Sequence, residues 1–196
     1  MTVCWVFAQV VHGVLAAPGN CPSPGTNNWR DDVCSLGGGL MVKSVPTNLE
    51  LSSKNCNTFY NKSEFQKQPV VTLSDAKPED KYTLLMVDPD APGLTKDTYY
   101  LHWIVANIEG EDFKKGNLTN AKTITPYAGP APPVGSGTHH YLLVVYLMRP
   151  GTRVAQHVED SQRSRFHLGE WTQKYNLCGP VAGLQYSANA SGNPTS

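Results

Sequence analysis

The chain has 196 residues, of which 40% are hydrophobic and 16% charged, a composition that suits one globular domain able to bury most of its apolar surface. Its 16 Lys and Arg residues balance 16 Asp and Glu residues, so no overall field favours binding to nucleic acid or to an acidic membrane. The stretch "RVAQHVEDSQRSRFH" is locally richer in cations, and we expect it to form the solvated face of a helix or loop.

Residues 1–17 form an apolar run that closes on small residues at Ala16 and Ala17. This pattern is typical of a secretory signal peptide cleaved near Ala17, although a core strand is the alternative. A bilayer span needs about 20 apolar residues, more than this run contains, so no stable membrane insertion is expected. We therefore predict a secreted, extracellular protein.

Cysteines and glycosylation signals are consistent with secretion. Removal of the leader leaves four cysteines that can form two disulfides in three possible pairings: Cys21, Cys34, Cys56 and Cys178. Because no C-x-x-C pair exists, zinc is not expected at these residues. Three N-x-S/T signals in polar surroundings predict glycosylated surface loops at Asn61, Asn117 and Asn189.

Residues 18–44 are rich in Gly, Pro and Asn at their start and contain "SLGGGLM", so we expect an irregular N-terminal arm. The predicted domain spans 45–186. Within it, short β-branched and aromatic runs predict strands at 70–73, 81–92, 101–110, 122–129 and 139–151.

The runs at 82–87 and 141–148 are apolar on both faces, which predicts central strands. Only 164–180, with Phe166, Trp171 and Tyr175 at about helical spacing, predicts one or two short helices. The tail 187–196 offers nothing to bury and is expected to be disordered. The fold class is therefore mostly β.

Polar residues gather around three of these strands. Asp88 and Asp90 lie in a proline-framed turn after the first central strand, and His102 begins an apolar run that must be buried. A rigid loop rich in Pro and Gly leads to His139 and Tyr141, which share one face of the next central strand. If these elements are neighbours, one pocket holds carboxylates, imidazoles, a phenol and backbone amides. Such a pocket suits a small anion held by protonated His, or a zwitterion such as a phosphoethanolamine head group.

The motifs "DPDAP", "HWIVANI" and "GPAPPVGSGTHHY" resemble, in order and spacing, the phosphatidylethanolamine-binding protein family. The resemblance runs from about residue 45 to residue 186. It implies a large antiparallel sheet, a smaller sheet against it and short C-terminal helices. It also implies an anion pocket formed by Asp88, His102, His139 and Tyr141, with Gly129 and Pro133 at its rim and Asp90 orienting the turn. The leader and cysteines resemble those of secreted invertebrate members.

We therefore expect a monomeric secreted protein that binds phospholipid head groups or similar small anions without a cofactor. A secreted inhibitor of serine-type peptidases, presenting residues 18–29, is the alternative. An enzyme is not expected, because no G-x-S-x-G elbow is present and Ser136 lies in its loop without an evident activating base. A metal site formed by Asp88, His102 and His139 is chemically possible but is not expected.

Overall fold

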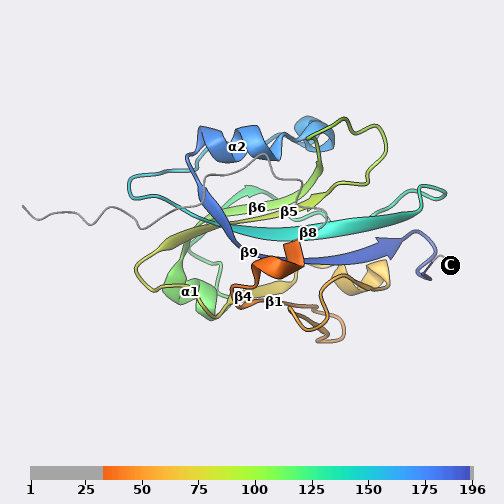
Figure 1. Ribbon diagram of the computed structural model, residues 1–196, viewed down its shortest axis with the longest axis horizontal. Coiled ribbons are helices and arrows are strands. Elements are labelled where there is room, and N and C mark those ends of the chain that lie inside the picture. Colours follow the sequence, from red (N-terminus) through yellow and green to blue (C-terminus); the bar gives the residue numbers. More distant parts are fainter. Residues whose placement is uncertain (1–32, 195–196) are drawn as a thin grey trace, which may run out of the picture.

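The computed structural model describes residues 33–194, which form two β-sheets flanked by short helices (Figure 1). The predicted leader, Cys21 and the first part of the arm lie outside the described residues. The large sheet has the strand order β3-β9-β8-β5-β6-β7, and the small sheet has the order β2-β1-β4. The mostly β prediction is confirmed.

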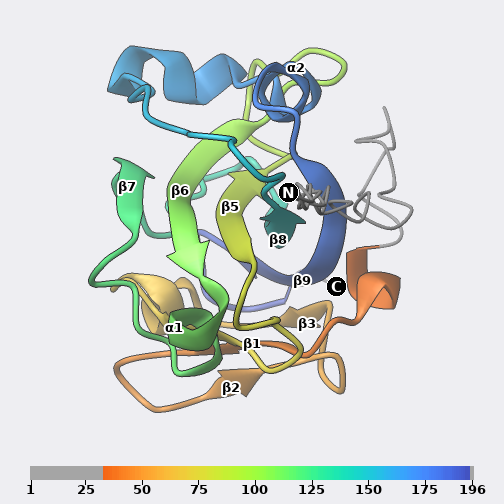
Figure 2. The same cartoon turned by 90° about the vertical axis from the view of Figure 1, so that its left-hand side faces the viewer.

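The large sheet is antiparallel except where β3 (Thr58–Phe59) runs parallel to β9 (Cys178–Asn189). Its other strands are β5 (Lys81–Asp88), β6 (Tyr100–Glu109), β7 (Lys122–Thr125) and β8 (Thr138–Leu147). The apolar strands β5 and β8 both have neighbours on two sides, as predicted for central strands. Seen end on, these long strands curve strongly (Figure 2).

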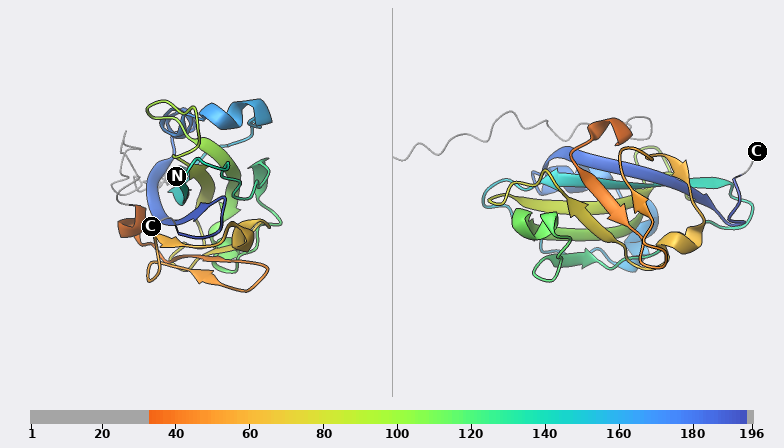
Figure 3. Two further views of the ribbon diagram at one scale, coloured as in Figure 1. Left: turned by 90° about the vertical axis from the view of Figure 1, so that its right-hand side faces the viewer. Right: turned by 90° about the horizontal axis from the view of Figure 1, so that it is seen from below.

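Each face of the large sheet is covered by a different layer. The small sheet, β1 (Leu40–Lys43), β2 (Glu50–Leu51) and β4 (Val70–Leu73), lies across one face (Figure 3). A core that includes Val42, Val71 and Leu143 fills the space between the two sheets. On the other face lie the 3-10 helix η4 (Asp160–Arg165) and α2 (Leu168–Lys174). The core on that side includes Leu142, Val144 and Trp171.

Regular structure begins earlier in the chain than the predicted domain start at residue 45. Residues 33–36 form the 3-10 helix η2 (Val33–Leu36), and β1 pairs with both β2 and β4, so the irregular-arm prediction is wrong for these residues. The glycines between them form a tight turn. A Cβ at Gly38 would lie 2.6 Å from the Val181 carbonyl oxygen, and Gly38 has a φ of +79°. Only glycine allows the chain to pass so close to β9.

The tail prediction is wrong for Ser187, Ala188 and Asn189. These residues complete β9 opposite Thr138–His140 and are at most 7% exposed. Backbone pairing with β8 holds them in the sheet, and Ala188 also packs in the core between the two sheets. The whole of β9 was missed as a strand, as was the short helix α1 (Gly110–Lys114).

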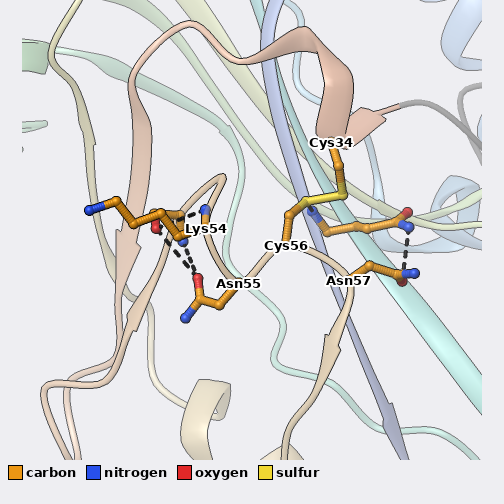
Figure 4. Close-up of a disulfide and its surroundings, with 7 residues drawn as sticks. Cys34, Lys54, Asn55, Cys56 and Asn57 are labelled. Carbon is orange, nitrogen blue, oxygen red and sulfur yellow. Dashed lines mark hydrogen bonds between the residues drawn. A yellow bond between two sulfur atoms is a disulfide. The ribbon is translucent and has the colours of Figure 1, made fainter.

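One disulfide joins η2 to the segment before β3. Cys34 and Cys56 are bonded, and the labelled pair lies beside β9 together with Asn57 (Figure 4). The Gln185 backbone N–H donates to Cys56 Sγ at 3.3 Å, and the Gln185 side chain donates to Asn57 at 3.0 Å. Cys178 is also disulfide-bonded. The disulfide therefore ties the segment before β1 to the edge of the large sheet.

The three predicted glycosylation sites have different surroundings. Asn61 is exposed at the start of the 3-10 helix η3 (Lys62–Phe65), and Asn117 is half-buried in a turn after α1. Asn189 is 3% exposed, and its side-chain oxygen accepts from the Gly192 N–H at 2.9 Å and the Ser191 hydroxyl at 2.9 Å. The prediction of a surface loop is wrong at Asn189.

Candidate functional site

Four polar side chains from three adjacent strands meet on the face of the large sheet that is turned toward the small sheet. We call Asp88, His102, His139 and Tyr141 the buried polar cluster; their exposed fractions are 3%, 4%, 1% and 0%. Asp88 ends β5, which lies between β6 with His102 and β8 with the other two. The structure thus brings together the four residues that the sequence singled out.

Asp88 and His139 form the centre of the cluster. Asp88 Oδ2 lies 2.7 Å from His139 Nδ1, and Asp88 Oδ1 accepts a 2.7 Å hydrogen bond from the Asp90 backbone N–H. Burial raises the pKa of the Asp88 carboxyl group, and the hydrogen bonds from His139 and the Asp90 N–H oppose that rise. The pair is therefore a hydrogen-bonded unit shielded from water.

Asp90 holds the DPDAP turn against β8. Its Oδ2 accepts from the His140 backbone N–H at 2.8 Å and lies 2.8 Å from His140 Nδ1. His140 points to the face opposite His139, as alternation along β8 predicts. Asp90 thus positions Asp88 from behind.

His102 reaches the cluster through a β-bulge. Val87 pairs with Leu101 and Met86 with Trp103, so His102 is an extra residue without a partner in the ladder. Leu101 consequently packs in the core beneath α2, while Trp103 packs in the core between the sheets. The bulge breaks the alternation of β6 and re-aims His102. No sequence pattern predicts it.

His102 is a neutral imidazole at pH 7. Burial lowers its pKa to about 4, and the nearby charges of Arg163 and His139 act in the same direction. Its Nδ1 lies 2.8 Å from the Ala128 carbonyl oxygen, which can only accept, so the single ring proton is on Nδ1. His102 Nε2 therefore presents a lone pair. The lowered pKa argues against a protonated His102 that donates to an anion.

Tyr141 supplies the complementary group. Its ring makes an edge contact with His102, with centroids 5.2 Å apart, and stacks on Tyr186 at 5.1 Å. Burial raises the pKa of the Tyr141 phenol, so its hydroxyl keeps its proton. Within residues 33–194, neither the Tyr141 hydroxyl nor His102 Nε2 has a hydrogen-bond partner. Two rings in edge contact thus carry one buried donor and one buried acceptor without partners in this part of the chain.

The loop at 126–137 covers the cluster and is held from both sides. The Ala128 N–H donates to the His102 carbonyl oxygen at 2.9 Å. A Cβ at Gly129 would lie 2.9 Å from Gln66 Cα, so the loop packs directly on η3. Pro133 is exposed, and its carbonyl oxygen accepts from the Ser136 hydroxyl at 2.7 Å.

Arg163 was missed by sequence reasoning. The cation-rich stretch was expected to be a solvated face, yet Arg163 is only 7% exposed. Its guanidinium donates to the carbonyl oxygens of Leu101 and His102 at 3.1 Å each and to that of Pro126 at 2.9 Å. It joins η4 to the bulge and to the loop because three carbonyls converge there.

The surroundings of Ser136 also differ from the prediction. Its Oγ lies 2.8 Å from His139 Nε2, so the loop serine does contact a basic group. The expectation that it lacks a nearby base is wrong.

Several cavities of the described residues lie away from the buried polar cluster. One of about 270 Å³ lies under α2 beside Trp171, one of about 570 Å³ lies beside Asn107 and Arg149, and one of about 230 Å³ lies beside Leu73 and Val181. Among the described residues, no three His, Cys, Asp or Glu side chains are placed to hold a metal ion. In the same part of the chain, no helix is both long and apolar enough to cross a membrane.

Comparison with known proteins adds family evidence. The family model described as "Phosphatidylethanolamine-binding protein" matches residues 43–186. A Drosophila melanogaster protein named "Putative odorant-binding protein A5" is 36% identical over 130 residues, which are 63% of this chain and 59% of that protein. The "26 kDa secreted antigen" of Toxocara canis is 32% identical over 142 residues, covering 69% of this chain and 52% of the antigen. The chain thus spans between half and three fifths of the length of these relatives.

Two solved structures are similar in fold. The phosphatidylethanolamine-binding protein of Plasmodium vivax superimposes with a TM-score of 0.61 at 20% identity, covering 87% of this chain and 99% of that one. Carboxypeptidase Y inhibitor, solved with its cognate proteinase, gives a TM-score of 0.60 at 20% identity and covers 78% and 84% of the two chains. At these identities the likeness concerns the fold alone.

Proposed function

The chain belongs to the phosphatidylethanolamine-binding protein family, and from this premise we propose that it is a secreted protein whose buried polar cluster binds phospholipid head groups or similar small anions. The binding residues are Asp88, His102, His139 and Tyr141, with Gly129 and Pro133 in the covering loop and Asp90 in support. Binding of this kind needs no chemical step and no cofactor.

The observation that carries the proposal is that the Tyr141 hydroxyl and His102 Nε2, two of the eight buried polar atoms without partners among residues 33–194, both belong to the buried polar cluster. A buried polar group without a hydrogen bond costs about 1–3 kcal/mol, so a ligand that satisfies both atoms gains that free energy. The Tyr141 hydroxyl has a proton to donate, and His102 Nε2 can only accept. A ligand with an anionic oxygen beside a hydrogen-bond donor fits both.

Phosphoethanolamine has this combination. Its phosphate oxygen can accept from the Tyr141 hydroxyl, and its ammonium group can donate to His102 Nε2. The carboxylate of Asp88 adds a negative charge on the same face of the sheet, which attracts an ammonium group and repels a second phosphate charge. The arrangement therefore favours a zwitterionic head group over a bare dianion.

The cluster is almost completely buried, so a ligand enters only when the covering loop at 126–137 moves. Gly135 and Gly137 both have positive φ angles, and a Cβ at either position would meet no atom within 4 Å, which leaves this part of the loop room to move. Loop opening is thus part of the proposal.

Secretion is supported by the Cys34–Cys56 disulfide, which persists in oxidising compartments, and by the relative named as a secreted antigen. The alternative of peptidase inhibition has only the fold of carboxypeptidase Y inhibitor in its favour. Residues 18–29, the surface considered for it, lie outside the described residues.

Isothermal titration calorimetry with O-phosphoethanolamine, inorganic phosphate and ethanolamine tests the proposal. We expect phosphoethanolamine to bind more tightly than either half alone. Equal affinity for phosphate and phosphoethanolamine would remove the role of the ammonium group. If neither phosphoethanolamine nor inorganic phosphate produced binding heat, the proposal would be overturned.

A further inference from the structure

A continuous chain of hydrogen bonds joins Ser136, His139 and Asp88. Ser136 Oγ lies 2.8 Å from His139 Nε2, and His139 Nδ1 lies 2.7 Å from Asp88 Oδ2. Hydroxyl, imidazole and buried carboxylate in this order are the groups that activate a serine in hydrolytic enzymes of unrelated folds. The order is recognised from geometry alone, and it does not require a G-x-S-x-G sequence.

We propose that Ser136 is a nucleophile toward small carboxylic esters, with His139 as its general base and Asp88 as the residue that orients His139. This activity goes beyond ligand binding. It rests on the proposed function in one respect, because the oxyanion formed during ester cleavage needs the same kind of stabilisation as a bound anion.

Ser136 lies in a tight turn that leaves its hydroxyl partly exposed, as a nucleophile requires. Gly135 and Gly137 flank it with φ angles of +82° and +83°, and a Cβ at either glycine would meet no atom within 4 Å. The turn is closed by a 3.2 Å hydrogen bond from the Ser136 N–H to the Pro133 carbonyl oxygen. Ser136 is half-buried while His139 is 1% exposed, so the hydroxyl lies where open space meets the buried polar cluster.

Asp88 is well placed for its positioning role. Its second oxygen is held by the Asp90 N–H at 2.7 Å, and Asp90 is itself bonded to the backbone of β8. The carboxylate therefore keeps one oxygen directed at His139 Nδ1, which favours the tautomer with its lone pair on Nε2. Tyr141 lies two residues further along the same face of β8, and its hydroxyl has no hydrogen-bond partner among residues 33–194.

The Ser136 proton has two acceptors in this structure. Ser136 Oγ lies 2.7 Å from the Pro133 carbonyl oxygen and 2.8 Å from His139 Nε2, and one hydroxyl proton can serve only one of them. Activation therefore requires the hydroxyl to turn from the Pro133 carbonyl oxygen toward the Nε2 lone pair.

The reaction balances without a further reagent. A bond forms between Ser136 Oγ and the ester carbonyl carbon, the carbon–oxygen bond to the leaving alcohol breaks, and the serine proton passes through His139 Nε2 to that alcohol. Water then attacks the acyl-serine while His139 takes its proton. Return of that proton to Ser136 Oγ releases the carboxylic acid and restores the enzyme.

A fluorophosphonate probe tests for the nucleophile directly, since a nucleophilic serine displaces fluoride and keeps the phosphonyl group. We expect peptide mass spectrometry to place the adduct on Ser136. We expect p-nitrophenyl acetate to be hydrolysed by the wild-type protein and at least about 100-fold more slowly by Ser136→Ala, the scale of general acid–base contributions. Ser164→Ala, at an exposed serine of η4, is the matched control and should leave both readouts unchanged.

The two proposals can fail separately. Phosphoethanolamine binding without an adduct on Ser136, or full ester hydrolysis in Ser136→Ala, would overturn the nucleophile and leave the binding function in place. An adduct on Ser136 without phosphoethanolamine binding would overturn the binding function and leave the nucleophile in place. Urea unfolding of Ser136→Ala establishes that the variant is folded before its activity is compared.

Discussion

Arg163 donates a 3.1 Å hydrogen bond to the carbonyl oxygen of His102, the residue that the β-bulge turns into the buried polar cluster. The same guanidinium reaches Leu101 and Pro126, and its Nε donates to Asp160 at 2.7 Å. A single buried cation thus connects η4, the start of β6 and the covering loop. Its role is structural, since it bonds backbone oxygens on the side away from the polar atoms left without partners.

Replacement of Arg163 by Met should lower the free energy of unfolding by about 2–4 kcal/mol, because three carbonyl oxygens lose a charged donor. Urea unfolding measures the change. Arg165→Met is the control, since Arg165 is exposed and should alter stability by no more than about 0.5 kcal/mol. Equal effects of the two substitutions would show that the buried hydrogen bonds contribute nothing.

His102 should make stability depend on pH. Its pKa of about 4 in the folded protein lies below the ordinary 6.5, so between these values the unfolded chain binds more protons at this position. The contribution of His102 is complete above pH 6.5 and is lost as the pH falls toward 4. The loss between pH 7 and pH 5 should be roughly 2 kcal/mol.

The raised pKa of Asp88 acts in the opposite direction, because the folded protein then takes up the extra proton. Comparison with His102→Gln isolates the histidine. Urea unfolding at pH 7 and pH 5 should show a steeper loss in the wild-type protein than in the variant. Parallel losses would mean that His102 is protonated in the folded state as readily as in the unfolded state.

Tyr141→Phe removes one buried hydroxyl and little else. We expect the affinity for phosphoethanolamine to fall about 10-fold or more, the free-energy equivalent of one hydrogen bond to a charged group. Stability should stay the same or rise, because the hydroxyl has no partner among residues 33–194. Tyr146→Phe, on the opposite face of β8, is the control for binding by calorimetry. Unchanged affinity in Tyr141→Phe would remove this residue from the site.

Glycosylation should follow the observed exposure of the three signals. In protein secreted from eukaryotic cells, we expect glycans at Asn61 and Asn117 and none at Asn189, whose side chain is buried and hydrogen-bonded. Glycopeptide mass spectrometry before and after enzymatic deglycosylation locates them. A glycan on Asn189 in folded protein would contradict the buried position of its side chain.

Sequence patterns were enough to predict the fold class and the central strands, and the family resemblance added the prediction that the four residues of the buried polar cluster meet. Continuous apolar runs in β5 and β8 required cover on both faces, and Asp88, His102, His139 and Tyr141 stood out as polar residues at the ends of such runs. Local patterns of this kind depend only on neighbours in the chain, so they can be read before folding.

The charge and the orientation of those residues depend instead on tertiary contacts. The bulge at His102, its neutral state, the burial of Arg163 and the contact of Ser136 with His139 all arise where segments far apart in the chain meet. Strand β1 and the end of β9 are too short or too polar to stand out in the sequence, and they join the fold by completing backbone ladders and by adding Leu40, Val42 and Ala188 to the core. Burial and hydrogen-bond partners set a pKa, and both are properties of the packed molecule.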